Sequence, residues 1–393
     1  MKITIRMYNV GFGDSFLLTV RQSNGVWRML VDCGVHTQGI GAHKIDDIVA
    51  DILETVTGAD GVPRLDVVVA SHRHRDHIIG FDNDAWQDVE VGEVWLPWVE
   101  DPDDTEAIAL RERQQLAARA LHMALAAADQ DWGDFALNSV TNDGAMSTLR
   151  EGFAGSPKRR YVSARGARPR PLPGLRGGSV YFLGPPRDTS GLSVMDPPKA
   201  ERWLTVDSGL SMMNGSALFP EHTIGKEDFG TAYQHLAVPD KLLDSLGAEP
   251  EDTLTAAFKL ENAINNTSVF FLLQLGDAML LFPGDAQWGA WRPLLEDADV
   301  RELLGRTTVY KVSHHGSHNG TPTTFGREVL ATGATSLLSV RPVPRFGSVP
   351  KVELVDNLDK GRRRVIATTH PDARHRHVER GPDDLWLEVT IPA

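Results

Sequence analysis

The segment "SHRHRDHIIG" (71–80) places three histidines and an aspartate within six positions, directly after the apolar run "LDVVVA". His72 and His74 are two residues apart, so on an extended segment or in a tight loop both imidazoles can face the same point. Asp76 and His77 follow and complete the pattern His-x-His-x-Asp-His. Imidazole nitrogens and carboxylate oxygens are typical ligands of zinc and its first-row neighbours. The segment therefore predicts a metal site at the end of a buried strand.

A second histidine cluster lies far downstream, in "KVSHHGSHNG" (311–320), and again follows an apolar run. It contains His314, His315 and His318, and Asp285 ends a third apolar run in "LLFPGDA". Because strand ends in α/β sheets converge at one edge, we expect these side chains to meet. An exposed polar loop is the simpler interpretation of either cluster alone, but it does not account for both. Two metal ions about 3.5–4 Å apart, bridged by one carboxylate, would use all of these ligands.

Such a site points to hydrolysis. Two cations lower the pKa of a bridging water from about 15.7 toward about 7, and Asp76 or Asp285 could orient the resulting hydroxide. The side chains of His315, His318 and Asn319 add hydrogen-bond donors suited to phosphate oxygens. His318 could equally cap the following helix or orient a ligand. Phosphodiester, lactone, thioester and β-lactam hydrolysis all fit this chemistry.

The elements that must position these residues alternate between strands and helices, which indicates an α/β fold. With 393 residues and 41% hydrophobic content, the chain can bury a sizeable core. In the first half we expect strands at 2–10, 15–21, 27–34, 65–71 and 93–98, and helices at 43–56 and 102–130. In the second half we expect strands at 178–186, within 268–286 and at 307–313, 336–340, 364–369 and 385–391, and helices at 288–305 and 322–333.

Composition narrows the location and the partners. The single cysteine, Cys33, excludes intrachain disulfides and a cysteine-based zinc site. Neither a signal peptide nor a membrane-spanning stretch is evident, so we expect a cytoplasmic protein without membrane contact. A net charge of −13 disfavours nucleic-acid binding over the surface as a whole. Residues 158–176, however, hold seven basic residues and no acidic one. They form either a solvated loop or a strip that binds a polyanion.

The motifs "HRHRDH", "PGDA", "SHHGS" and "VDCG" resemble the metallo-β-lactamase fold superfamily. More narrowly, their order resembles its ComEC-like branch, which is related to the hydrolase domain of DNA-uptake competence proteins. The resemblance covers about residues 1–100, 178–186 and 260–393. It implies a single αββα-sandwich domain over 1–393. Two insertions would interrupt that domain: 101–177, helical and then a basic loop, and 187–259, a lid or partner surface.

The resemblance also implies roles for individual residues. His72 and His74 would bind one metal, Asp76 and His77 the other, and Asp285 would bridge the two. One histidine of the pair at 314 and 315 would complete the second metal site, and the other would stand near the substrate. We favour His314 as the ligand because it is nearer the strand end. Asp32, in "VDCG", would support the site from below.

The chain departs from that pattern at two places. Many superfamily members carry a further histidine ligand where this chain has "NNTS", with Asn265 and Asn266. One metal would then be open or weakly held. Near the C-terminus the branch often has Gly-His-Pro, whereas this chain has "FGSVP" with Ser348. This second departure concerns substrate contacts rather than the metal ligands.

The implied activity is that of a dinuclear hydrolase with two divalent ions, zinc or alternatively manganese. We expect a phosphodiesterase or nuclease that uses a metal-activated hydroxide on a nucleic acid or another phosphodiester. One alternative is a lactone, ester or thioester hydrolase that acts on a small molecule. The other is an effector subunit whose insertions dock onto a protein partner that gates the same site.

Overall fold

The computed structural model describes residues 1–23, 25–115, 142–192, 194–203, 263–343, 349–369 and 377–392. Within these ranges the expected helix at 102–130 is helical over 105–115, and its remainder lies outside the described residues. Most of the expected insertion at 187–259 lies outside them as well, as does Ser348, where the chain departs from the Gly-His-Pro element.

Eight of the described strands form the first sheet, in the order β14-β15-β1-β2-β3-β4-β5-β6. Neighbouring strands are antiparallel from β14 to β3 and parallel from β3 to β6. The first and last long strands pair with each other, with Ile3 opposite Ile391. The strands are β1 (Lys2–Tyr8), β2 (Ser15–Gln22), β3 (Gly25–Cys33), β4 (Arg64–Val69), β5 (Glu90–Pro97), β6 (Lys158–Val162), β14 (Val378–Arg380) and β15 (Trp386–Ile391).

The second sheet has the order β13-β12-β11-β10-β9-β8-β7 within the described residues. It is parallel from β10 to β13 and antiparallel from β7 to β10. Its strands are β7 (Arg170–Pro171), β8 (Gly178–Phe182), β9 (Phe271–Leu275), β10 (Ala278–Phe282), β11 (Val309–Lys311), β12 (Thr335–Leu338) and β13 (Arg364–Ala367).

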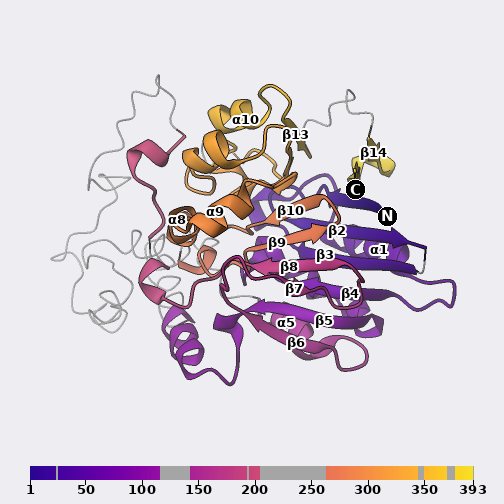
Figure 1. Cartoon of the computed structure of the whole chain (residues 1–393). Helices are drawn as coiled ribbons and strands as arrows, with labels where there is room; N and C mark the ends of the chain where they lie inside the picture. Colours follow the sequence, from indigo (N-terminus) through magenta and orange to yellow (C-terminus); the bar gives the residue numbers. More distant parts are fainter. Residues whose placement is uncertain are drawn as a thin grey trace.

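The two sheets pack face to face, and helices cover their outer faces (Figure 1). Alternate residues of both sheets, such as Ile5 and Leu280, fill the core between them. The helices α1 (Ile45–Val56) and α5 (Asp143–Ser147) pack on the first sheet, and α8 (Trp288–Glu296), α9 (Ala298–Leu304) and α10 (Val352–Leu358) pack on the second. The α/β class expected from the sequence is therefore confirmed, with a helix–sheet–sheet–helix order of layers.

Short helical segments complete the described chain. The four-residue helix α2 (Arg75–Ile78) follows the first histidine pair. The turns are η1 (Thr37–Gly39), η2 (Ile79–Phe81), η3 (Asp84–Asp88), η4 (Trp98–Glu100), η5 (Thr148–Gly152), η6 (Thr189–Gly191), η7 (Lys199–Glu201), η10 (Ser313–Gly316), η11 (Phe325–Val329) and η13 (Pro382–Asp384). In the described part of the chain, no helix combines the length and the apolar character needed to span a bilayer.

Two expectations about secondary structure are wrong. The basic stretch is not a loop throughout, because it contributes β6 at the edge of the first sheet. The guanidinium of Arg160 makes two hydrogen bonds to the Glu93 carboxylate on β5, at 2.9 and 3.0 Å, which neutralises part of this basic strand. The expected helix at 288–305 is two helices, because Asp297 ends the first and its carboxylate accepts from backbone N–H groups at the start of α9.

Candidate metal centre

The first set of candidate ligands follows β4 in one continuous segment. After the strand, the chain bends at His72 and Arg73, His74 is extended directly before α2, and Asp76 lies in the first turn of that helix. Nε2 of His72 and Nδ1 of His74 are 2.9 Å apart, so the two rings face a common point as their spacing predicts. All three side chains are buried.

The second set comes from two loops of the second sheet. Asp285 follows β10, and His315 follows β11 within η10. Both His314 and His315 have left-handed backbones, with φ of 48° and 51°. Such conformations are uncommon for residues other than glycine, and they are concentrated at functional sites where the surrounding structure holds them. Asp32 is also left-handed, with φ of 57°.

Two glycines allow the loops to approach each other this closely. A Cβ on Gly13 would lie 2.7 Å from the carbonyl oxygen of Asp76 and closer still to that of Gly34. A Cβ on Gly284 would lie 2.8 Å from Cβ of Ser268, and its φ of 59° is left-handed. Glycine is therefore required on each side of the site.

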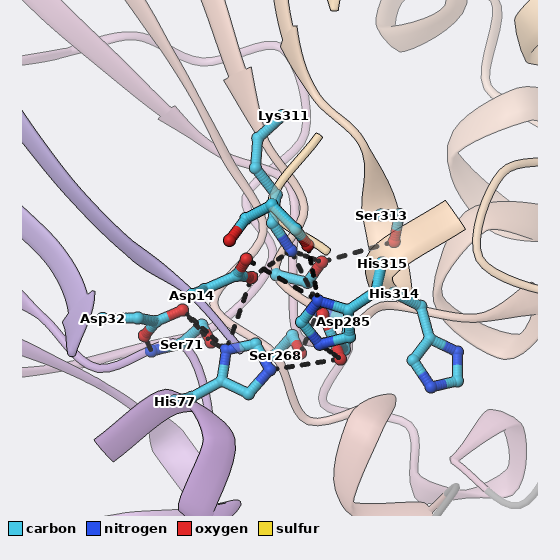
Figure 2. A network of polar contacts seen from close by, with 12 residues as sticks. Asp14, Asp32, Ser71, His77, Ser268, Asp285, Lys311, Ser313, His314 and His315 are labelled. Carbon is cyan, nitrogen blue, oxygen red and sulfur yellow. Dashed lines mark hydrogen bonds and ion pairs between the residues drawn. The ribbon is translucent and has the colours of Figure 1, made fainter. Parts of the chain in front are cut away.

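Four side chains meet where these loops converge (Figure 2). Nε2 of His77 lies 3.1 Å from Oδ2 of Asp285 and 3.8 Å from Oδ2 of Asp76. Nε2 of His315 lies 3.2 and 3.4 Å from the same two oxygens. Four ligands placed about 2.0–2.1 Å from a zinc ion in a tetrahedron are about 3.3–3.4 Å apart. The four nitrogen–oxygen separations, 3.1–3.8 Å, are therefore close to those between neighbouring ligands of one metal ion.

The two Nε2 atoms support the same conclusion. Both are buried, and within the described part of the chain neither makes a hydrogen bond of acceptable angle. A buried imidazole nitrogen without a hydrogen bond is costly, and a metal ion would remove that cost. The other ring nitrogen of each histidine does have a hydrogen-bond partner. Nδ1 of His77 lies 2.8 Å from the Asp32 carboxylate, and Nδ1 of His315 lies 3.1 Å from the carbonyl oxygen of Ser339. Such outer contacts orient metal-binding histidines.

The first histidine pair lies beside this group. The ring centres of His72 and His77 are 4.2 Å apart. Nδ1 of His72 lies 3.1 Å from the Ser71 hydroxyl and 3.4 Å from that of Ser268, so its Nε2 faces His74. Ser71 in turn donates its hydroxyl and its backbone N–H to Asp32. Nε2 of His72 and Nδ1 of His74 are thus the atoms available to a second ion.

Comparisons with known proteins identify no family. A scan of the chain against models of protein families finds no match, and a search of the curated proteins finds no significant similarity. The assignment of the site therefore depends on the geometry of its side chains.

Burial and charge set the protonation of the site. Burial alone would lower the pKa of His315, but the carboxylates of Asp285 and Asp14 raise it to about 10. The pKa of His77 is likewise raised against the effect of burial, by Asp285 and Asp76. The pKa of His72 is lowered well below its usual range, mainly by burial. In the absence of a metal, His77 and His315 therefore carry protons at neutral pH while His72 does not.

The structure reverses the expected roles of the histidine doublet. His315, and not His314, faces Asp76 and Asp285, while the ring of His314 points away from them (Figure 2). Nδ1 of His314 lies 3.0 Å from the amide oxygen of Asn319, and its Nε2 lies 3.5 Å from the amide nitrogen of Asn265. The left-handed backbone turns the second histidine of the pair inward, so nearness to the strand end does not identify the ligand.

Two further predicted residues do not face the side chains of Asp76, His77, Asp285 and His315. Nε2 of His318 contacts the Asp196 carboxylate at 3.1 Å instead of extending toward Asp285. The side chain of Asn266 donates to the carbonyl oxygens of Leu192 and Val194 and accepts from the backbone of Gln287. Asn266 therefore holds neighbouring loops together, and Asn265 is the member of the pair that lies near a histidine of the site.

The sequence did not identify Asp14 and Lys311, both of which are buried at the centre of the site. One ligand atom each of Asp14, His77, Asp285 and His315 lies within 4.8 Å of the others. Asp14, however, contacts the two imidazoles from behind, at Nδ1, with distances of 3.6 and 3.8 Å. We therefore assign Asp76, which faces Nε2, as the ligand in place of Asp14. The sequence does carry a sign of Lys311, because a lysine stands within the otherwise uncharged segment "TTVYKVS" (307–313) at a position that faces inward.

Proposed function

We propose that this chain is a dinuclear metal-dependent hydrolase of the metallo-β-lactamase fold superfamily, with a phosphodiester as its substrate. The observation that carries the proposal is that Nε2 of His77 and of His315 both face the carboxylates of Asp76 and Asp285, with nitrogen–oxygen separations of 3.1–3.8 Å. The pair formed by His72 and His74 supplies a second position beside it. The N/O ligand set suits zinc, and manganese is the main alternative.

The buried charge supports two ions. Four carboxylates, those of Asp14, Asp32, Asp76 and Asp285, are buried around one buried ammonium, that of Lys311. Among the described residues this leaves an excess of three negative charges when the histidines are neutral. Such an excess is costly in a low-dielectric interior. Without metal, protons on His77 and His315 reduce the excess to one. When metal binding displaces those protons, two divalent cations and one bound anion would balance the three negative charges.

The ions would supply Lewis acidity and a water of lowered pKa. The residues of this chain would supply orientation and hydrogen bonds. The carboxylates of Asp76 and Asp285 stay ionised, because the pKa-lowering effect of His77 and His315 outweighs the effect of burial. His314 has a pKa lowered to about 4, mainly by burial, and so is neutral at pH 7. Its Nδ1 donates to the Asn319 amide oxygen and its Nε2 accepts from the Asn265 amide nitrogen, so the neutral ring can position these two amides beside the substrate.

A phosphodiester is favoured over other electrophiles by basic residues at the same edge of the sheets. The backbone N–H of Arg165 donates to the carbonyl oxygen of Phe182 at the end of β8. Since β8 is antiparallel to β9, and β9 to β10, the ends of β8 and β10 lie at one edge. Arg165 and Arg168 are exposed, and neither forms an ion pair with another described residue. Their charges are available to a polyanion.

A small-molecule lactone, ester or thioester remains the second candidate substrate. It is favoured by the net charge of −13 and the sequence pI of about 5.5, which repel nucleic acid over most of the surface. The same ligands would serve either substrate, and the fold does not choose between them.

The test combines metal analysis with a substrate screen. We expect two divalent ions per chain, and metal-dependent cleavage of bis(p-nitrophenyl) phosphate and of labelled single-stranded DNA. His74→Ala should lose one ion and the cleavage activity. His377→Ala, which removes an exposed histidine away from the site, should keep both ions and the cleavage activity. Turnover of lactones or thioesters without phosphodiester cleavage would favour the second candidate, and a wild-type protein that binds no metal would refute the whole proposal.

A further inference from the structure

Lys311 is a lysine in the interior of a sandwich. It is the last residue of β11, and its side chain is 3% exposed. Val309 lies in the core between the sheets and Tyr310 on the outer face, so Lys311 shares the inward face of Val309. Its ammonium contacts the Asp14 carboxylate, the carbonyl oxygen of Gly284 at 3.0 Å and Oδ1 of Asp285 at 3.1 Å. These three acceptors use all three of its N–H donors.

The contact with Lys311 divides the two oxygens of Asp285 between different partners. Oδ1 faces Lys311, and Oδ2 faces Nε2 of His77 and of His315. A carboxylate rotates easily about its terminal bond, so an aspartate without such a contact has no fixed orientation. The ammonium therefore holds Asp285 with one oxygen directed at the candidate ion position.

Asp14 extends this contact to the other sheet. It lies directly before β2 of the first sheet, and its backbone N–H donates to the carbonyl oxygen of Asp76 at 2.9 Å. Its carboxylate contacts Lys311 of the second sheet. A continuous series of contacts thus runs from Asp76 through Asp14 and Lys311 to Asp285, and it joins the two loops that carry these carboxylates. Figure 2 shows the part from Asp14 through Lys311 to Asp285.

We propose that Lys311 and Asp14 form a positioning pair, which holds Asp285 in its ion-binding orientation and keeps the ligand sets of the two sheets at the correct separation. This inference rests on the proposed metal-dependent function. Stability alone is a weak reason for such a pair, because well-packed apolar side chains often replace a buried ion pair at no cost. Orientation of a metal ligand is a role that apolar side chains could not take over.

Substitutions separate positioning from simple electrostatics. If Lys311 acted only through its charge, Lys311→Met would make the site more negative and bind cations more tightly. The double substitution Asp14→Asn/Lys311→Met removes one charge of each sign, so on that view it would leave affinity unchanged. Positioning predicts weaker cation binding in both proteins, because Asp285 loses its fixed orientation in each.

The experiment measures Co²⁺ affinity by competition with a chromophoric chelator, together with the visible spectrum of bound Co²⁺, which reports its coordination. We expect Asp14→Asn/Lys311→Met to bind Co²⁺ at least tenfold more weakly, with an altered spectrum. Lys360→Met, at an exposed lysine, serves as the control and should match the wild type. Thermal unfolding of the chelator-treated proteins reports any loss of fold separately.

Affinity and a spectrum equal to those of the wild type in the double variant would overturn the inference. If that variant does not fold, Lys311→Met decides the question, because tighter or unchanged binding refutes positioning and at least tenfold weaker binding supports it. Failure of the metal hypothesis is distinguishable, since the wild type itself would then bind no Co²⁺. A wild type that binds two ions while the variants bind them equally well would refute only the role of the pair.

Discussion

The two halves of the candidate site are built differently. The first ligand set lies in one segment, residues 71–77, where a bend leads into α2 and local geometry aims the side chains. The second set comes from two separate loops, and its histidine depends on consecutive left-handed residues, His314 and His315. The first arrangement is local to one short segment. The second exists only where tertiary contacts hold a backbone that the residues would not adopt by themselves.

Asp285 is where the two halves meet, and its removal should have the largest effect. It is 3.1 Å from His77 of the first segment and 3.2 Å from His315 of the second. We expect Asp285→Ala to lose both ions and to reduce hydrolysis about a thousandfold, a loss of about 4 kcal/mol in transition-state stabilisation. Elemental analysis and the rate of phosphodiester cleavage measure the two effects.

Asp277→Ala is the matched control for this substitution, because Asp277 is an exposed aspartate in the turn between β9 and β10. It should keep the metal content and the rate of the wild type. An Asp285→Ala protein that retains one tightly bound ion would show that the halves bind metal independently, and that Asp285 does not bridge them.

The histidine doublet tests the second half by itself. We expect His315→Ala to lose one of the two ions and about a hundredfold in rate, because His315 faces both Asp76 and Asp285. His314→Ala should keep both ions and lose no more than about tenfold in rate, because His314 contacts Asn265 and Asn319 rather than the ligand carboxylates and one hydrogen bond contributes about 0.5–1.5 kcal/mol. The metal content of the two variants, measured side by side, shows which of the two histidines matters more for ion binding. The reverse order would mean that the left-handed turn presents His314 to the ion after all.

The same contrast explains what the sequence predicts. The pattern His-x-His-x-Asp-His is local, because His72 and His74 are two residues apart and a bend between them brings their rings together. The strands that carry the ligands are also readable, as in β4 and β10, where continuous apolar runs indicate burial on both faces. The α/β class, most of the strands and the close approach of His72 to His74 could therefore be predicted.

The rest of the site depends on contacts between distant residues. The choice between His314 and His315 is set by backbone angles that spacing does not encode. Asp14 and Lys311 become partners only when the two sheets pack, and neither belongs to a recognisable ligand pattern. The edge strand β6 was also missed, because its basic residues suggest a loop until Glu93 of the neighbouring strand is placed beside Arg160.

Proton release should distinguish the two ion positions. His77 and His315 have raised pKa values without metal, about 10 for His315, whereas the pKa of His72 is lowered by burial. A metal-bound imidazole must be neutral, so an ion at His77 and His315 displaces two protons near pH 7. Its affinity should rise about tenfold per proton for each pH unit, until the pH passes these pKa values.

Calorimetric titration in buffers of different ionisation enthalpy counts the protons released. We expect the ion that binds at His77 and His315 to release two protons from these histidines. The ion that binds at the other position should release none from His72. In His315→Ala, the ion that remains should be the one at His72 and His74. The affinity for this ion should rise less steeply with pH than the affinity for the ion at His77 and His315 in the wild type. Equal slopes for both ions would show that the two positions carry the same protonation before metal binds.

The smallest effect should come from Arg165 and Arg168, which lie beyond the metal-binding loops. Arg165 is about three strand spacings, roughly 14 Å, from the end of β10. A polynucleotide held at the metal centre can reach that far, and bis(p-nitrophenyl) phosphate cannot. We expect Arg165→Ala/Arg168→Ala to weaken single-stranded DNA binding about fivefold at low salt. The slope of log affinity against log salt should fall by about 1.4, since each phosphate contact contributes about 0.7.

The control pair is Arg362→Ala/Arg364→Ala, because these exposed arginines precede or begin β13 at the opposite edge of the sheet. It removes the same charge, so a general electrostatic effect would lower DNA binding equally in both proteins. A loss confined to the first pair would mean that the substrate path runs from the metal centre along the ends of β8 and β6. Equal binding by all three proteins would remove the main argument for a polyanion and favour a substrate small enough to contact the ligand loops alone.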